Sequence, residues 1–162
     1  TVSMKLLAIQ QTDYDDVLAL NAESVPHVNL IGRDQLLWFD DHASFVQVVK
    51  IDDSLAGFLI GLRPGIEYAS PNYRWFCEHY DDFAYIDRVA VSKWARRRGV
   101  AEALYTAFAD SQSDAPVLTC EVNIRPRNDG SMQFHERLGF RQVGSQETDG
   151  GSKEVALMEK ML

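Results

Sequence analysis

Cysteine, basic side chains and long hydrophobic runs are all scarce in this chain of 162 residues. Its two cysteines, Cys77 and Cys120, are too few and too isolated for a disulfide framework or a zinc cluster, so we expect no metal and a reducing, cytoplasmic setting. The most apolar short run, residues 56–62, is far below the roughly 20 residues needed to span a bilayer. We therefore expect no membrane association and no signal peptide.

Negative charge predominates, with 24 Asp and Glu residues against 16 Lys and Arg residues and a net charge of −8. Nucleic-acid backbones are bound through Lys and Arg, so this balance argues against a nucleic-acid partner. The composition is otherwise typical of a globular protein, with 46% hydrophobic and 25% charged residues. A chain of this length buries roughly 68–70% of its unfolded surface. We therefore expect residues 1–162 to form a single domain without help from a metal or a disulfide.

The hydrophobic pattern predicts strands that alternate with helices in the middle of the chain and pair as hairpins at both ends. Asp52 and Asp53 are expected to form the turn of the first hairpin, and Asp149 and Gly150 that of the last. A short helix is expected to begin after Ser70. The predicted fold class is α/β, an α+β mixed sheet of about seven strands with about four helices.

One predicted helix has an unfavourable start. The pattern predicts a helix from Trp94 to about Asp110, directly after a strand at residues 83–91. The first turn of that helix then carries three arginines and a glycine, Arg96, Arg97, Arg98 and Gly99. Exposed cations at a helix N-terminus cost about 0.3–1 kcal/mol each, and a glycine inside a helix costs about 1 kcal/mol relative to alanine.

A bound phosphate would explain this start. The helix follows a strand, so its N-terminus lies at the carboxyl end of that strand, where open sheets bind ligands. Unsatisfied N–H groups and the positive end of the dipole make such a place an anion site, and Gly99 lets the backbone approach a phosphate closely. The alternative is that the arginines are solvated surface. Neither a P-loop nor a dinucleotide fingerprint occurs in the sequence.

Two blocks of the sequence resemble one protein family. Residues 96–101, RRRGVA, match the R/Q-x-x-G-x-G/A signature of the GNAT superfamily of N-acetyltransferases, and they follow a strand ending in VAV as in that family. Downstream, Asn128 precedes residues 134–140, FHERLGF, which are similar to the family's Asn followed by F/L-Y-E-K-x-G-F. The order of strands and helices matches over nearly the whole chain. The resemblance implies a GNAT-like acyl-CoA N-acyltransferase fold.

The resemblance also implies that acetyl-CoA is the cosubstrate and that a primary amine, of a small molecule or a peptide, accepts the acetyl group. In this family the turn amides hold the pyrophosphate of coenzyme A, and the preceding strand pairs with the pantetheine arm. The implied cofactor-binding residues are Val89, Ala90 and Val91 along the pantetheine, Arg96 at the first signature position, Arg97, Arg98, Gly99, Val100, Ala101 and Glu102 around the pyrophosphate, and Asn128.

A general base helps such a reaction, because an amine of pKa about 10.4 is neutral in only about one molecule in 10³ at pH 7. The resemblance offers Glu121, near the end of a strand where several members place a catalytic glutamate, and Asp87, on the fourth strand. A carboxylate on a buried strand face is costly unless it is paired. Arg88 is expected on the opposite face from Asp87 and is not an obvious partner. A structural hydrogen bond or salt bridge is the alternative for one carboxylate, and Glu121 is favoured as the base.

His135 stands where the family usually has tyrosine as the acid. A histidine of pKa near 6.5 could protonate the leaving sulfur, or it could merely fill space in its helix. The resemblance implies that the acceptor site is formed by the first two helices and the loop at residues 63–82, whose carboxylates and aromatic faces would attract a cation. The alternative is that these aromatic side chains pack the segment onto the domain. Many relatives form dimers, so the sequence leaves both a monomer and a homodimer as alternatives.

Two other functions are compatible with the same residues. One is a catalytically inactive module that binds or senses acyl-CoA with the same phosphate site. The other is an interaction domain whose arginines meet an acidic protein. The presence of both Glu121 and Asp87 favours an enzyme whose catalytic residues are Glu121, His135 and Asp87.

Overall fold

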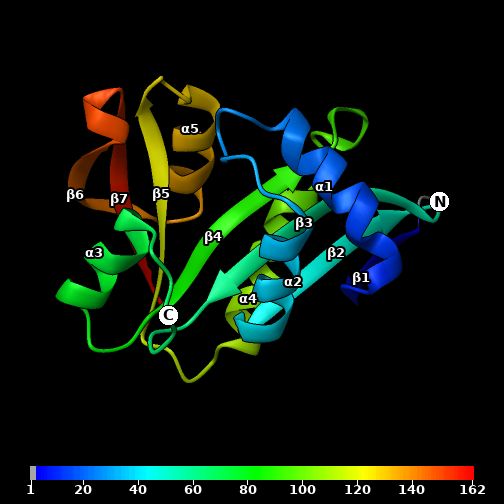
Figure 1. Ribbon diagram of the computed structural model, residues 1–162, viewed down its shortest axis with the longest axis horizontal. Helices are drawn as coiled ribbons and strands as arrows, with labels where there is room; N and C mark the ends of the chain where they lie inside the picture. The colour runs from blue at the N-terminus through cyan, green and yellow to red at the C-terminus, as the bar shows by residue number, and fades with distance from the viewer. Residues whose placement is uncertain (1–2) are drawn as a thin grey trace. The chain divides into compact units, whose positions relative to one another are not determined.

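The computed structural model describes residues 3–162 and confirms the mixed α/β fold. Seven strands form one sheet in the order β1-β2-β3-β4-β5-β7-β6 (Figure 1). Five α-helices occur in the described residues, in agreement with the expected number of about four. The chain divides into two compact units, one comprising the residues up to Leu62 with Ile86–Gln112, the other Arg63–Tyr85 with Ser113–Leu162. Within residues 3–162, no helix combines the length and the apolar character that crossing a membrane requires.

The first unit is built on three antiparallel strands. Its elements are β1 (Met4–Ala8), α1 (Tyr14–Glu23), α2 (Arg33–His42), β2 (Phe45–Ile51), β3 (Ser54–Leu62), most of β4 (Ala84–Val91) and α4 (Val100–Ser111). β1 pairs with β2 and β2 with β3. The predicted turn between β2 and β3 is confirmed: Asp52 and Asp53 have φ of 50° and 65°, the left-handed values of tight hairpin turns. Figure 1 shows α1 and α2 in front of β2 and β3, with α4 behind.

Two glycines of β3 allow α4 to pack closely against the sheet. A Cβ at Gly61 would come within 2.3 Å of the Phe108 ring, and a Cβ at Gly57 within 2.8 Å of Val100 Cγ1. Such approaches are closed to any residue with a side chain. The Gly57 Cβ would also lie 2.8 Å from the Ala90 carbonyl oxygen of β4. Gly57 therefore sets the first residue of α4 beside the end of β4.

The predicted start of α4 at Trp94 is wrong. A 3₁₀ turn at Lys93–Ala95 is followed by a bend, and the α-helix begins only at Val100. Arg97 and Gly99 both have left-handed backbones, with φ of 64° and 77°, which no α-helix accommodates. The arginines thus lie in a turn before the helix, so neither a cation in the first turn nor an internal glycine weakens α4.

The second unit combines an antiparallel three-stranded part with two helices. Its elements are α3 (Pro71–His79), β5 (Val117–Arg125), α5 (Asp129–Arg137), β6 (Arg141–Thr148) and β7 (Lys153–Met161), and it also holds the first two residues of β4. β7 pairs with both β5 and β6. β4 pairs in parallel with β5 at Ala84–Leu118 and Tyr85–Thr119. The predicted hairpin between β6 and β7 is confirmed, as is the helix start at Ser70, whose side chain accepts from Tyr73 N–H.

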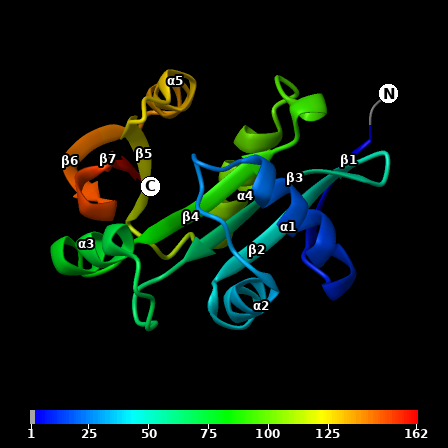
Figure 2. The same ribbon diagram turned by 45° about the horizontal axis from the view of Figure 1, so that its top comes forward.

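α3 is fastened to β6 and β7 by shape and by charge. A Cβ at Gly144 would lie 2.8 Å from the Trp75 ring, so only glycine leaves room for that indole. The Tyr80 hydroxyl donates to Glu159 Oε1 at 2.5 Å, and Arg141 Nη2 lies 2.6 Å from Glu159 Oε2. Figure 2 shows α3 and α5 on opposite sides of β5, β7 and β6. The second unit therefore has its own core.

Candidate functional site

The turn between β4 and α4 is shaped to hold an anion. The first helical hydrogen bond runs from Ala103 N–H to the Gly99 carbonyl at 3.0 Å. The N–H groups of Val100, Ala101 and Glu102 therefore precede the first bond of the helix and point out of its N-terminus. Left-handed residues within such a turn orient successive N–H groups toward one concavity. Arg97 and Gly99 supply that backbone here.

Positive charge surrounds this turn. Arg96, Arg97 and Arg98 are exposed, and none of the ion pairs within residues 3–162 involves them. The Arg98 guanidinium lies 6.0 Å from the centroid of the exposed Trp94 ring. A Cβ built at Gly99 meets no atom within 4 Å, so the space in front of the turn is open. The residues present fit a diphosphate, because they provide open space, several N–H donors and three cations without intramolecular counter-charges.

The end of β4 offers main-chain groups beside this turn. Ser92 N–H donates to the Ala56 carbonyl of β3 at 2.8 Å, and the Ala90 carbonyl also lies near β3. Peptide groups alternate in direction along a strand. Those of Val89 and Val91 therefore point away from β3, in the direction that pairing with a pantetheine arm would need. Both valines are half-buried, whereas Ala90 is buried.

Glu121 has a specific hydrogen-bond partner in the second unit. The Tyr85 hydroxyl of β4 donates to Glu121 Oε2 of β5 at 2.7 Å. Tyr85 is 0% exposed, and Glu121 is half-buried. A buried tyrosine hydroxyl needs a partner, and a carboxylate is a strong acceptor for it. The sequence pattern assigned no role to Tyr85; its hydroxyl in a strand expected to be buried was the one signal that could have pointed to it.

The expectation that Arg88 does not pair with Asp87 is wrong. Arg88 Nε donates to Asp87 Oδ2 at 2.8 Å, and both side chains are 3% exposed. The guanidinium also donates to Asn21 Oδ1, to the Asn29 carbonyl and to Asn29 Oδ1. Arginine is long enough to fold back along its strand and reach its neighbour. This buried pair supports the structural alternative for Asp87 and leaves Glu121 as the stronger candidate base.

His135 lies on α5 and is 4% exposed. Its Nδ1 is 2.7 Å from the Ser131 carbonyl oxygen, so Nδ1 carries the proton. Burial lowers the pKa of the His135 imidazole, and the bond to Ser131 opposes that shift only in part. The ring is therefore neutral at pH 7 and has no proton on Nε2 to give. This geometry supports the structural alternative, and a role as acid stays a prediction that requires protonation of Nε2.

Asn128 serves first as a helix cap. Its Oδ1 accepts from Ser131 N–H at 3.2 Å, at the start of α5. This bond leaves both the amide nitrogen and the second lone pair of Oδ1 as groups with which Asn128 could contact coenzyme A. The cofactor-binding residues from Val89 to Glu102 lie together in the first unit with Asp87, whereas Glu121, Asn128 and His135 belong to the second. Among residues 3–162, no group of His, Cys, Asp or Glu side chains could hold a metal ion.

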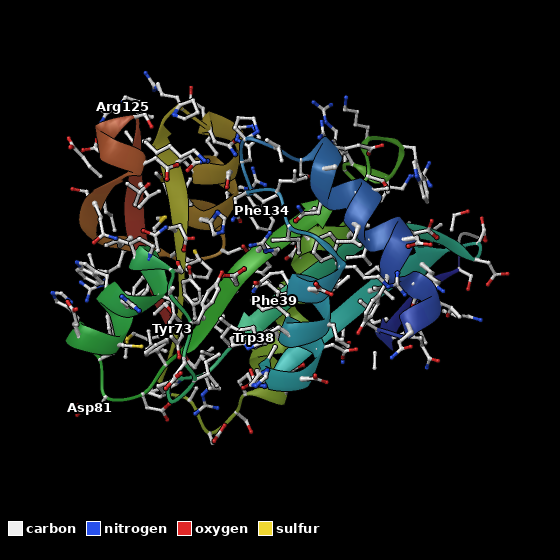
Figure 3. All side chains as sticks on the ribbon, in the orientation of Figure 1. Trp38, Phe39, Tyr73, Asp81, Arg125 and Phe134 are labelled. Atoms are coloured by element: carbon white, nitrogen blue, oxygen red, sulfur yellow. The ribbon has the colours of Figure 1, made fainter. Side chains whose placement is uncertain are left out.

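The aromatic segment between β3 and β4 turns largely inward. Tyr73 and Phe76 on α3 are 1% and 0% exposed (Tyr73 is labelled in Figure 3). The Tyr73 hydroxyl donates to the Arg63 carbonyl at 2.8 Å, and that of Tyr80 is bound to Glu159. The packing interpretation is therefore confirmed for these three aromatic residues.

Comparisons with known proteins agree with this arrangement. The model of the Acetyltransferase (GNAT) family matches residues 10–140. No curated protein is significantly similar to the chain in sequence.

Solved structures share the fold over nearly their whole length. Ard1 from Thermoplasma volcanium has a TM-score of 0.79 at 18% identity, with 98% of this chain and 97% of that one covered. The ribosomal-protein-S18-alanine N-acetyltransferase from Escherichia coli has 0.73 at 15%, with 97% and 92% covered. Naa50 from Arabidopsis thaliana, in complex with the bisubstrate analogue CoA-Ac-MVNAL, has 0.73 at 13%, with 99% of both chains covered.

The family match and the shared fold define the class of protein as an acyltransferase enzyme. More narrowly, the chain belongs to the Acetyltransferase (GNAT) family, whose members use acetyl-CoA. Family membership favours an enzyme over the sensing and interaction alternatives.

Proposed function

We propose that this enzyme transfers the acetyl group of acetyl-CoA to a primary amine, of a peptide or a small molecule, with Glu121 as the general base. The observation that carries the proposal is the turn before α4. There, two left-handed residues, Arg97 and Gly99, adjoin three exposed guanidinium groups and an open helix N-terminus. A peptide acceptor is supported by the similar structure that holds a peptide-bearing CoA analogue and by the one named for an alanine of a ribosomal protein.

The cofactor is proposed to bind along the first unit. The N–H groups from Arg97 to Glu102 would hold the pyrophosphate, and Arg96, Arg97 and Arg98 would neutralise its charge. The peptide groups of Val89 and Val91 would pair with the pantetheine amides. Bound acetyl-CoA supplies a thioester, whose carbonyl carbon is the electrophile of the reaction.

The second unit supplies the proposed base. Glu121 would accept a proton from the acceptor ammonium, which gives the neutral amine that attacks the carbonyl carbon. A thiol of pKa about 8.5 is a better leaving group than an amine, so the departing thiolate needs less assistance. The proposal therefore does not require His135 to act as an acid.

Turnover of the purified protein tests this proposal. The protein would be incubated with acetyl-CoA and with either spermidine or peptides beginning with Ala, Ser or Met, while released thiol and acetylated product are measured. We expect product with at least one acceptor class, and a kcat that falls about 10²–10⁴-fold in Glu121→Gln at unchanged affinity for acetyl-CoA. Wild-type kcat in Glu121→Gln would overturn the assignment of the base. Absence of acetyl-CoA binding by the wild type would overturn the whole proposal.

Location and assembly complete the proposal. Cys77 and Cys120 form no disulfide within residues 3–162, which is compatible with a reducing compartment. On this basis we propose a cytoplasmic location, to be tested by fractionating cells that express the tagged protein. Light scattering decides whether the homodimer left open by the sequence exists, since the chain alone has a mass of 18.3 kDa.

A further inference from the structure

Tyr85 reaches Glu121 from a fixed position. Tyr85 of β4 pairs in register with Thr119 of β5, which lies two residues before Glu121. The hydroxyl donates to Glu121 Oε2 at 2.7 Å, which is a normal length for a hydrogen bond to a carboxylate. Because Tyr85 is 0% exposed, no solvent competes for this hydroxyl from its own side. The bond therefore fixes one oxygen of the carboxylate.

The Tyr85 ring is itself held by α3. The rings of Tyr73 and Phe76 both lie 5.7 Å from it, centroid to centroid, at interplanar angles of 60° and 48°. Both residues are buried, and Tyr73 is tied to the Arg63 carbonyl. These tilted and edge contacts restrict the Tyr85 ring to one orientation. The chain of contacts thus runs from α3 through Tyr85 to the carboxylate of Glu121.

We propose that Tyr85 is a positioning residue for Glu121, an inference that rests on the proposed role of Glu121 as base. With Oε2 fixed by the tyrosine hydroxyl, the carboxylate presents Oε1 to the acceptor amine in one direction. In this role Tyr85 acts through Glu121.

A double-mutant cycle on the full chain tests this proposal. Tyr85→Phe removes only the hydroxyl, and we expect kcat to fall about tenfold while KM for the acceptor and Kd for acetyl-CoA stay within twofold of the wild type. In the Glu121→Gln background, the same change should alter kcat by less than twofold, because the carboxylate through which Tyr85 acts is gone. A purely structural tyrosine would lower kcat equally in both backgrounds.

Tyr80→Phe is the matched control. Tyr80 makes the same kind of bond in the same unit, with its hydroxyl 2.5 Å from Glu159 Oε1, but Glu159 is paired with Arg141 and has no proposed catalytic role. This variant should lose stability and keep its kcat.

If Tyr85→Phe fails to fold, Phe76→Leu replaces it as the test variant. Phe76→Leu loosens the Tyr85 ring but keeps the hydroxyl, and its smaller loss of kcat should also vanish in the Glu121→Gln background.

Three results would overturn the inference, and they are distinguishable. A kcat within twofold of wild type in Tyr85→Phe, with a large loss in Glu121→Gln, would refute the positioning role and leave the proposed function standing. Multiplying losses in the double variant would show that Tyr85 acts independently of Glu121. Wild-type kcat in Glu121→Gln would refute the base assignment, and the inference with it.

Discussion

Replacing Gly99 by alanine should lower both the stability of the protein and its affinity for acetyl-CoA, for two different reasons. Gly99 has φ of 77°, and alanine in that region costs roughly 1–2 kcal/mol. In a domain of this size 1 kcal/mol lowers Tm by about 2–4 °C, so we expect Tm to fall by about 2–8 °C. The new methyl group meets no protein atom within 4 Å and instead enters the space proposed for the pyrophosphate. Affinity for acetyl-CoA should therefore fall at least about tenfold, or about 1.4 kcal/mol.

Gly150→Ala is the control for this variant. Gly150, between β6 and β7, has φ of 67°, and a Cβ added there would also meet no atom within 4 Å, so alanine carries the same backbone cost at a residue with no proposed role in binding. Calorimetric titration with acetyl-CoA and thermal unfolding would be measured for both variants. Similar losses of Tm, with weakened binding in Gly99→Ala alone, would support the phosphate site. Binding within twofold of wild type in both variants would refute it.

Three further changes test the packing and the electrostatics of each unit. Arg88→Ala leaves Asp87 as a buried, unpaired carboxylate, so the free energy of unfolding in urea should fall by about 3–5 kcal/mol; a loss below about 1 kcal/mol would contradict the buried pair. Burial lowers the folded-state pKa of His135, so stability is lost as pH falls below about 6.5, where the unfolded chain binds the extra proton. His135→Gln should lose less stability between pH 7 and 5.5 than wild type, and equal losses would exclude this origin. Gly144→Ala forces the Trp75 ring to move and should cost about 1–3 kcal/mol with a shifted tryptophan emission, whereas unchanged emission and stability would contradict that contact.

Local chemistry made several turns and helix ends predictable from the sequence. The Asp52–Asp53 turn and the helix start at Ser70 depend on residues close together in the chain. Each is determined by backbone preference or by a nearby side-chain cap. The seven strands were predictable from the hydrophobic pattern within each strand, which is also a local feature of the sequence.

The start of α4 was not predictable in this way. The residue types at positions 94–99 do not show where the helix begins, and nothing in the residue type of Arg97 indicates a left-handed backbone. The structure places Arg97 at φ of 64°, and only this geometry shows that the arginines precede the helix. The order of residues could suggest a phosphate site before α4 but not the shape of the turn that would form it.

The candidate base shows a second limit. Strand alternation placed Arg88 opposite Asp87, but the length of the arginine side chain overrides that rule and allows the two to pair. Tyr85 and Glu121 are 36 positions apart in the chain. No local pattern links residues at that separation, so a hydrogen bond between them emerges only from the register of β4 with β5.

The fastening of α3 has a consequence for protein engineering. A designer seeking a new acceptor preference would be tempted to exchange the segment between β3 and β4 as a cassette. Trp75, however, occupies the room that Gly144 leaves, and Tyr80 completes the partners of Glu159. A graft that lacked these two aromatic residues would leave a void against β6 and a carboxylate short of one donor on β7. Any exchange of this segment must therefore redesign Gly144 and Glu159 in the same step.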